Sequence, residues 1–242
     1  MDWTEAALLF ALVGFAATVQ PVAGFGFALL VAPPLALLIG PKEAVVVSNA
    51  LSVALNAALL TRQHGGVEWR LGAVLFAGAL AGMPLGLAIL IVADPDVLQV
   101  AIALSVIIFT LLLIRGLRLH SLGRPGDFGA GVVSGILNTS TSMSGPPVVL
   151  YLQGSGMAPP RFRATLTAFF LVNGVAGVVL LAAAGRVTGD AAGQTLVGLP
   201  AVLLGFAGGS ALAGRVPLVF FRPIVFGLLF LAAAIALAAA LA

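Results

Sequence analysis

The sequence has no cysteine and little charge, and both shortages restrict what the protein can be. Without cysteine there are no disulfides, no thiolate metal sites and no thiol redox chemistry. Charged residues make up 8% of the 242 residues, whereas about a quarter is usual in soluble domains. Because 61% of the residues are also hydrophobic, we expect an integral membrane protein.

The basic balance of the sequence does not indicate a nucleic-acid partner. There are 11 Lys and Arg against 8 Asp and Glu, which gives a net charge of +3. The charges fall between the hydrophobic stretches, in predicted loops that also contain His64 and His120. We therefore interpret the excess of basic residues as a topology signal.

Most of the stretches without charge have the length of one membrane crossing. An α-helix rises about 1.5 Å per residue, so about 20 residues cross a hydrocarbon core of about 30 Å. Six stretches of this length predict transmembrane helices: residues 44–61, 71–93, 97–114, 164–185, 191–214 and 223–242. Two others, residues 6–39 and 128–160, are too long for one crossing and too short for two full ones.

Each of the two long stretches is interrupted by residues that break helices. The interruptions are Gln20-Pro21-Val22-Ala23-Gly24-Phe25-Gly26 and Asn138-Thr139-Ser140-Thr141-Ser142-Met143-Ser144-Gly145-Pro146-Pro147. Proline removes a backbone donor and glycine loosens a helix, so each stretch is predicted to form two half-helices that meet at a non-helical tip. Such backbone at membrane depth needs cover from protein or water.

The two halves of the chain resemble each other. At one common offset, Gln20 aligns with Asn138, Gly26 with Ser144 and Pro41 with Pro159. In each half a broken stretch is followed by three helices, an internal repeat of the kind found in secondary transporters. We therefore predict an all-α polytopic membrane protein of two repeats, residues 1–117 and 118–242, each a broken-helix hairpin followed by three transmembrane helices. Each hairpin is either re-entrant or makes two short crossings.

The positions of the basic residues favour one topology. If each long stretch returns to the side it entered from, only Lys42 and Arg186 lie on one side, and the other basic residues share the opposite side: Arg62, Arg70, Arg115, Arg118, Arg124, Arg161, Arg163, Arg215 and Arg222. Single crossings would divide the basic residues almost evenly. Because basic loops lie on the cytoplasmic side, we predict inverted repeats in the cytoplasmic (inner) membrane of a prokaryote, with both termini outside.

No Asp, Glu, Lys, Arg or His lies inside a predicted crossing. Membrane enzymes and proton-coupled transporters usually keep such groups within the bilayer. The serines of the interior have no intramembrane base to activate a hydroxyl. We therefore expect no enzyme activity, no cofactor and no metal site.

The interior instead offers neutral donors at the two helix breaks. The start of each second half-helix exposes backbone N–H groups at the positive end of the helix dipole, which suits a small anion. The candidate binding residues are polar, glycine and aromatic residues of the tips, and one Asn from the helix that follows each hairpin. They are Gln20, Gly24, Phe25, Gly26, Asn56, Asn138, Thr139, Ser140, Ser142, Ser144 and Asn173.

These residues also have structural explanations. A single Ser or Thr can serve only to bond a neighbouring helix, and a Phe beside a Gly can serve only to pack. Asn56 and Asn173 either line the site or brace a tip. Ser48, Asn49 and Ser52 recur at about one helical turn, so they face either the same cavity or another helix.

Glycines recur at helical spacing in both halves of the chain. Gly78-x-x-x-Gly82-x-x-x-Gly86 lies in the first half, and Gly205-x-x-x-Gly209 lies at the corresponding place in the second. Such a pattern lets two helix backbones approach closely. We expect these faces to pack either within the chain or at the interface of a homodimer.

Both halves also contain glycine and proline motifs of a known type. They are Gln20-Pro21-Val22-Ala23-Gly24-Phe25-Gly26-Phe27, Pro33-Pro34, Pro41-Lys42-Glu43-Ala44, Asn138-Thr139-Ser140 and Ser144-Gly145-Pro146-Pro147. The chain resembles the TauE/SafE family of sulfite exporter-like permeases over essentially its whole length. The resemblance implies a carrier of sulfite, a sulfonate or another small anion. Phe25, Phe27 and the Ser/Thr-rich second tip depart from the more glycine-rich family motif, which leaves the cargo open.

The prediction is therefore a membrane transporter that moves a small anion, sulfite or an organosulfonate, by alternating access. Its site would lie near the membrane midplane, between the two hairpin tips. Two alternatives stay open at this point. A membrane scaffold subunit would bind no anion, and a neutral-solute channel would show flux that does not saturate.

Overall fold

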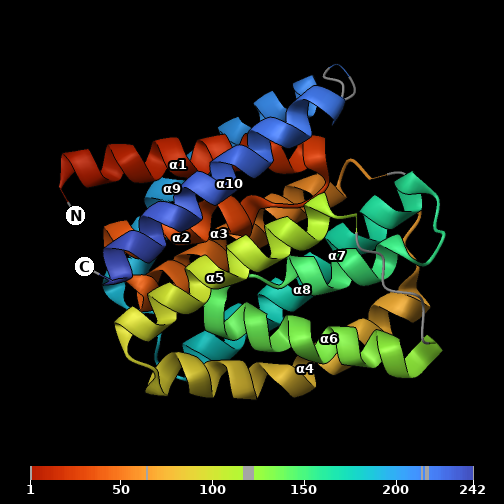
Figure 1. Ribbon diagram of the computed structural model, residues 1–242, viewed down its shortest axis with the longest axis horizontal. Helices are drawn as coiled ribbons and strands as arrows, with labels where there is room; N and C mark the ends of the chain where they lie inside the picture. The colour runs from red at the N-terminus through yellow and green to blue at the C-terminus, as the bar shows by residue number, and fades with distance from the viewer. Residues whose placement is uncertain (1, 64, 117–122, 214, 216–217, 242) are drawn as a thin grey trace.

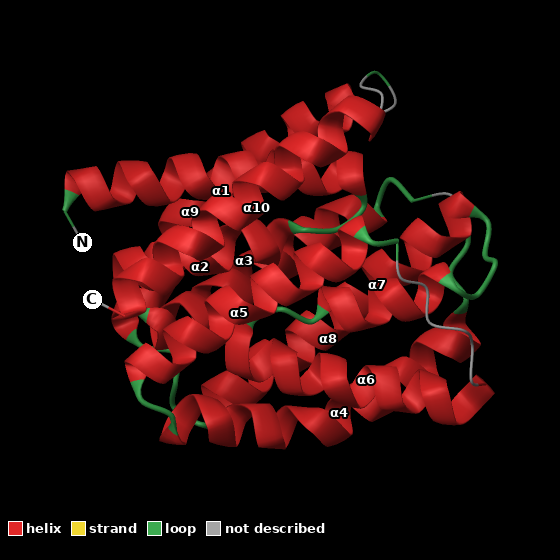
Figure 2. Ribbon diagram, viewed as in Figure 1, coloured by secondary structure: helices red, strands yellow, loops and turns green. Residues whose placement is uncertain are grey.

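The computed structural model describes all residues except 1, 64, 117–122, 214, 216–217 and 242 (Figure 1). The described residues form helices and loops without any strand, which confirms the predicted all-α class (Figure 2). The helices are α1 (Trp3–Ala23), α2 (Phe27–Ile39), α3 (Pro41–Leu60), α4 (Trp69–Val92), α5 (Pro95–Ile114), α6 (Gly123–Thr141), α7 (Gly145–Gln153), α8 (Pro159–Ala183), α9 (Gly189–Leu212) and α10 (Leu218–Leu241).

The helices follow the charge-free stretches closely. Among the described residues, α1, α3, α4, α5, α8 and α9 are each long and apolar enough to cross a membrane. Most helices begin a few residues before the first uncharged residue. Helix α8 shows this best, since it starts at Pro159, a residue type that suits the first helical position, and includes Arg161 and Arg163 in its first turns.

The prediction of two half-helices in residues 6–39 is wrong in one respect. Helix α1 has 21 residues, so it is about 31 Å long and can cross the membrane on its own. Gln20 and Pro21, expected in the break, lie in its last turns. A proline this close to the end removes only one backbone hydrogen bond, and the helix continues until Gly24, whose φ of 88° ends it.

The second break is also shorter than predicted. Asn138, Thr139, Ser140 and Thr141 belong to α6, and only residues 142–144 are non-helical. The hydroxyls of Ser140 and Thr141 donate to the carbonyls of Ile136 (2.7 Å) and Leu137 (3.0 Å), four residues earlier. This bond is compatible with a helix, so the run of Ser and Thr does not end α6.

Both broken stretches fold back as antiparallel hairpins. In Figure 1, α1 and α2 have their open ends at the end of the bundle that carries both chain termini, whereas α6 and α7 open at the opposite end. We call these the termini end and the arginine end. Lys42 and Arg186 flank turns at the termini end, and the other described basic residues flank helix ends at the arginine end: Arg62, Arg70, Arg115, Arg124, Arg161, Arg163 and Arg215. Arg222 lies near the start of α10, and Arg118 lies outside the described residues.

Glycines fix the first helix of each hairpin against a helix of the other half. Helix α6 packs along α4, where a side chain on Gly78, Gly82 or Gly86 would collide with the α6 backbone. Helix α1 packs along α9 in the same way, at Gly205 and Gly209. The glycine faces are therefore covered within the chain, and a homodimer stays a prediction that needs another surface.

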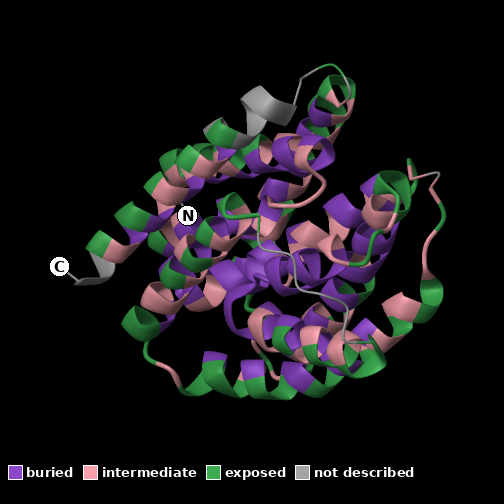
Figure 3. Ribbon diagram, turned by 45° about the vertical axis from the view of Figure 1, so that its right-hand side comes forward, coloured by how far each residue is buried: buried purple, intermediate pink, exposed green. Residues whose placement is uncertain are grey.

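The core lies between these two pairs of helices. Figure 3 shows buried residues in the middle of the bundle and exposed ones on its outer helices. The core contains most of α2 and α3, with Phe27, Leu35 and Leu51 almost fully buried. Large apolar side chains are exposed on the outer helices, as expected where lipid is the solvent. The two hairpin tips therefore lie inside a packed, apolar bundle.

Candidate functional site

The two hairpin tips meet at one small cavity. Its walls come from both tips and from α3 and α8: Gln20, Phe25, Gly26, Phe27, Ala28, Leu29, Ser52, Met143, Ser144, Gly145, Pro146 and Phe170. The cavity measures about 30 Å³, which is room for about one or two water molecules. We call it the tip cavity. In the present conformation it is too small for sulfite.

A larger cavity of about 560 Å³ lies next to the tip cavity. Its lining includes Gly156, Met157 and Pro159, which belong to the connection into α8 and so place it at the arginine end. We call it the vestibule. Phe25, Gly26 and Leu29 line both cavities, and Phe25 is half-buried between them. Phe25 is the largest of the three residues that the vestibule and the tip cavity share.

The first tip presents unpaired backbone donors to the tip cavity. Gly24 and Gly26 have φ values of 88° and 113°, which glycine alone adopts easily, and they turn the chain directly into α2. Helix α2 has no side-chain cap, so the N–H groups of Phe27, Ala28 and Leu29 have no helical partner. All three residues line the cavity at the positive end of the α2 dipole.

The second tip is poorer in such donors. Helix α7 begins with Gly145, Pro146 and Pro147, and the two prolines have no N–H group. The carbonyl of Ser144 accepts a hydrogen bond from the hydroxyl of Ser134 (2.6 Å), which holds the tip against α6. The start of α7 therefore offers an anion far less than the start of α2.

Two consecutive hydrogen bonds made by side chains hold the first tip in place. Gln20 is buried and donates from Nε2 to Oδ1 of Asn56 (2.9 Å). Asn56 in turn donates from Nδ2 to the carbonyl of Ser52 (2.7 Å). Because the amide of Asn56 is fixed in this way, the orientation of Gln20 at the cavity wall is fixed as well.

The second tip is braced differently. Asn138 donates from Nδ2 to the carbonyl of Asn173 (3.1 Å), and its own carbonyl accepts from Nδ2 of Asn49 (3.0 Å). Gly177 makes room for this, since a side chain there would collide with the amide of Asn138. The side-chain amide of Asn173 is fully buried and has no hydrogen-bond partner among the described residues.

The hydroxyls of the second tip point mostly into protein. Thr139 donates to the carbonyl of Met83 on α4 (2.8 Å), and Ser140 bonds within α6. The hydroxyl of Ser142 is buried without a partner in the described part of the chain, as is that of Ser48 on α3. These residues join helices and shape the tip, and they do not line the tip cavity.

The predicted site residues thus fall into two groups. Gln20, Phe25, Gly26 and Ser144 line the tip cavity, Gly24 adjoins it, and Asn56 holds Gln20. The others lie behind the second tip: Asn138, Thr139, Ser140, Ser142 and Asn173. The lining residues that the sequence did not predict as binding residues include Ala28, Leu29 and Gly145. Gly145 was part of the predicted second break, and the only signal of Ala28 and Leu29 is their position shortly after the first one.

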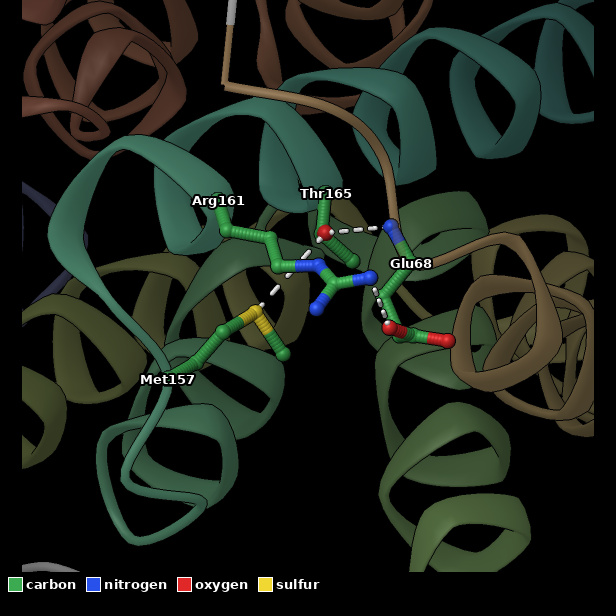
Figure 4. A network of polar contacts seen from close by, with 4 residues as sticks. All are labelled: Glu68, Met157, Arg161 and Thr165. Atoms are coloured by element: carbon green, nitrogen blue, oxygen red, sulfur yellow. Dashed lines mark hydrogen bonds and ion pairs between the residues drawn. The ribbon is translucent and has the colours of Figure 1, made fainter.

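The tip cavity has no charged residue among those that line it. At the arginine end, one ion pair is formed between Arg161 and Glu68 (2.8 Å), drawn in Figure 4. The backbone N–H of Glu68 also donates to the hydroxyl of Thr165 (3.0 Å), so this network fixes the start of α8 to the segment before α4. Within the described residues, no cluster of acidic or histidine side chains is suited to a metal ion.

Comparison with known proteins identifies the family. No curated protein and no solved structure matches the chain. Residues 9–236 match the family model described as "Sulfite exporter TauE/SafE", which covers nearly the whole chain. The match agrees with the six helices of the described residues that are long and apolar enough to cross a membrane. The chain therefore belongs to the TauE/SafE family and is a multi-pass membrane transporter.

Proposed function

We propose that the protein carries sulfite or an organosulfonate across the cytoplasmic membrane by alternating access at the tip cavity. The observation that carries this proposal is the single cavity between two hairpin tips that approach from opposite ends of the bundle. Non-helical backbone at membrane depth is stable only where it lines such a cavity or is buried in protein. The family match supports sulfite as the transported anion, and the geometry supports a binding site between the two tips.

The first tip supplies the attraction for negative charge. The three residues that carry the uncapped N–H groups at the start of α2 line the tip cavity, as does Gln20. Backbone donors at a helix start, in an apolar and water-poor setting, bind an oxyanion without any fixed cation. This arrangement fits a small anion better than a neutral solute, because a neutral solute gains nothing from the helix dipole.

Transport requires the tip cavity to open in turn to each side. In the present conformation the vestibule lies at the arginine end, and Phe25 lines both the vestibule and the tip cavity. Movement of Phe25 would admit the anion from this side. Since basic residues gather at this end, it is the cytoplasmic side of the proposed topology, and both termini lie outside.

The proposed alternation rests on two inverted repeats, residues 1–117 and 118–242. The repeats are supported by the way each hairpin packs on the other half of the chain: α1 lies on α9, and α6 lies on α4. Helices at equivalent places also pack on each other, α3 on α8 and α5 on α10. An inside-negative potential favours anion export by about 2.3 kcal/mol per charge per 100 mV, so no coupled ion is required.

Flux measurements in proteoliposomes test this proposal. We expect saturable, voltage-dependent efflux of radiolabelled sulfite or sulfoacetate and no flux of an uncharged sulfone of similar size. A scaffold subunit would give no flux of either solute. A neutral-solute channel would pass the sulfone without saturation, and either result would overturn the proposed function.

A further inference from the structure

Arg163 lies directly against the first hairpin tip. Its Nη2 donates to the carbonyl of Val22 in the last turn of α1, at 3.4 Å. A side chain on Gly24 would touch the stem of Arg163, with both Cγ and Nε at 3.7 Å. The neighbours of Gly24, Ala23 and Phe25, line the vestibule, as does Phe162. Arg163 itself lines neither cavity, but its guanidinium group lies against residues of the first tip whose neighbours line the vestibule.

The guanidinium group of Arg163 has a weaker partner than those of Arg161 and Arg62 at the same end. Arg161 is paired with Glu68, and Arg62 stacks on the ring of Phe206 at 5.2 Å. In the described part of the chain, Arg163 has no carboxylate within 4.0 Å. Its bond to Val22 is long for a hydrogen bond, so exchange for a better acceptor costs little.

We propose that Arg163 is the charged group that captures the substrate anion at the first tip. The guanidinium leaves the carbonyl of Val22 and donates two parallel hydrogen bonds to oxygens of the anion, a geometry that suits sulfite, sulfonates and carboxylates. The anion then passes Phe25 to the uncharged donors of α2. This inference rests on the proposed function and adds a charged residue to a site otherwise built from neutral groups.

Breaking the bond to Val22 also removes one contact between the end of α1 and α8. Arg163 is half-buried and belongs to α8, whereas Val22 and Gly24 belong to the tip of the first hairpin. Capture of the anion therefore removes one contact that holds this tip in place. Substrate binding and movement of the first tip are coupled through this one side chain.

Anion affinity in three variants tests the role of Arg163. We expect Arg163→Gln to raise the Kd for sulfite and the KM for efflux roughly tenfold or more, the usual loss for a charged hydrogen bond. Arg163→Lys keeps the charge but not the paired donors, so it should fall between Arg163→Gln and the unsubstituted protein. Arg161→Gln is the matched control, two residues away, and should leave both constants unchanged.

A second measurement needs no variant to fold. Phenylglyoxal modifies accessible arginines, and mass spectrometry reports each site separately. Sulfoacetate, whose sulfonate sulfur does not add to the carbonyl groups of phenylglyoxal as sulfite does, should protect Arg163 and leave Arg215 labelled. Equal labelling of Arg163 with and without sulfoacetate, or unchanged sulfite affinity in Arg163→Gln, would overturn the role of Arg163 alone. Absence of anion binding and flux in the unsubstituted protein would overturn the proposed function, and this inference with it.

Discussion

The two hairpins share one plan and differ at their tips. In both, a long first helix packs through glycines on a helix of the other half, and a shorter second helix follows a break of three residues. The first tip turns on Gly24 and Gly26 and leads into a helix whose first amides have no side-chain cap in the described part of the chain. The second turns on Ser142, at φ 62°, and leads into two prolines.

This difference assigns different tasks to the tips. The first tip keeps the donors that an anion needs, and Arg163 adds a charge beside it. The second tip has lost donors to proline and is held by side-chain bonds to α3, α4 and α8. Under the proposed function, the anion binds mainly to the first tip, and the second tip closes the cavity from the other side.

The largest expected effect tests what the hairpins share. Gly82→Ala places a methyl group on the carbonyl of Val132 in α6, and Gly209→Ala places one on the carbonyl of Thr18 in α1. Because backbone cannot yield easily, each should destabilise the fold by about 3 kcal/mol. Melting in detergent measures this effect. Gly208→Ala, one residue away in open space, is the control and should not lower the melting temperature. Similar melting temperatures for Gly208→Ala and Gly209→Ala would refute the close packing of α9 on α1 at Gly209.

The next effect concerns Asn56 and Asn173, which lie at equivalent places in the two halves of the chain. Asn56→Leu leaves Nε2 of Gln20 buried without an acceptor, so it should destabilise the protein by about 2 kcal/mol. Asn173→Leu removes an amide that has no partner, and it should stabilise the protein by about 1 kcal/mol. The same thermal melting distinguishes them. Changes of the same sign at both positions would mean that the second tip is braced as the first one is.

A third effect tests the unequal donors directly. Ala28→Pro removes one free N–H from the start of α2, as Pro146 does naturally in α7, without breaking a helical hydrogen bond. We expect sulfite affinity to fall about tenfold, the usual value for one hydrogen bond to a charged group. Pro147→Ala is the reverse change at the second tip: it adds one N–H to the start of α7 and should leave affinity unchanged. Calorimetric titration in detergent would measure both, and a tighter binding of sulfite by Pro147→Ala would place the anion against both tips.

The sequence was sufficient for the helices and for the existence of both breaks. Charge cannot be buried in lipid without large cost, so uncharged stretches reveal the helices within a few residues of their ends. Gly24 and Gly26 reveal the first break, since a positive φ favours glycine. The glycine seams were also visible as a spacing, although their partners were not.

The composition of the site was less predictable, because it depends on where each donor points. Thr139 and Ser140 look like binding residues in the sequence, yet their hydroxyls are used by carbonyls of α4 and α6. Arg161 and Arg163 look alike among the basic residues of one side. Only the fold separates them, because Glu68 reaches one and the first tip reaches the other.

The smallest expected effect lies at the turn residue of the second tip. Ser142 has a φ of 62°, which a side chain adopts at a cost of about 1 kcal/mol, and its buried hydroxyl has no partner in the described part of the chain. Ser142→Gly removes both costs but adds the entropy that glycine loses on folding. We therefore expect a net gain in stability below about 1 kcal/mol, measured by melting in detergent. Gly26→Ala, at a φ of 113° in the first tip, should change stability in the opposite direction. If Ser142→Gly lowers the melting temperature instead, the hydroxyl of Ser142 has a partner. The second tip would then have a donor of its own, and the division of tasks between the tips would be smaller than proposed.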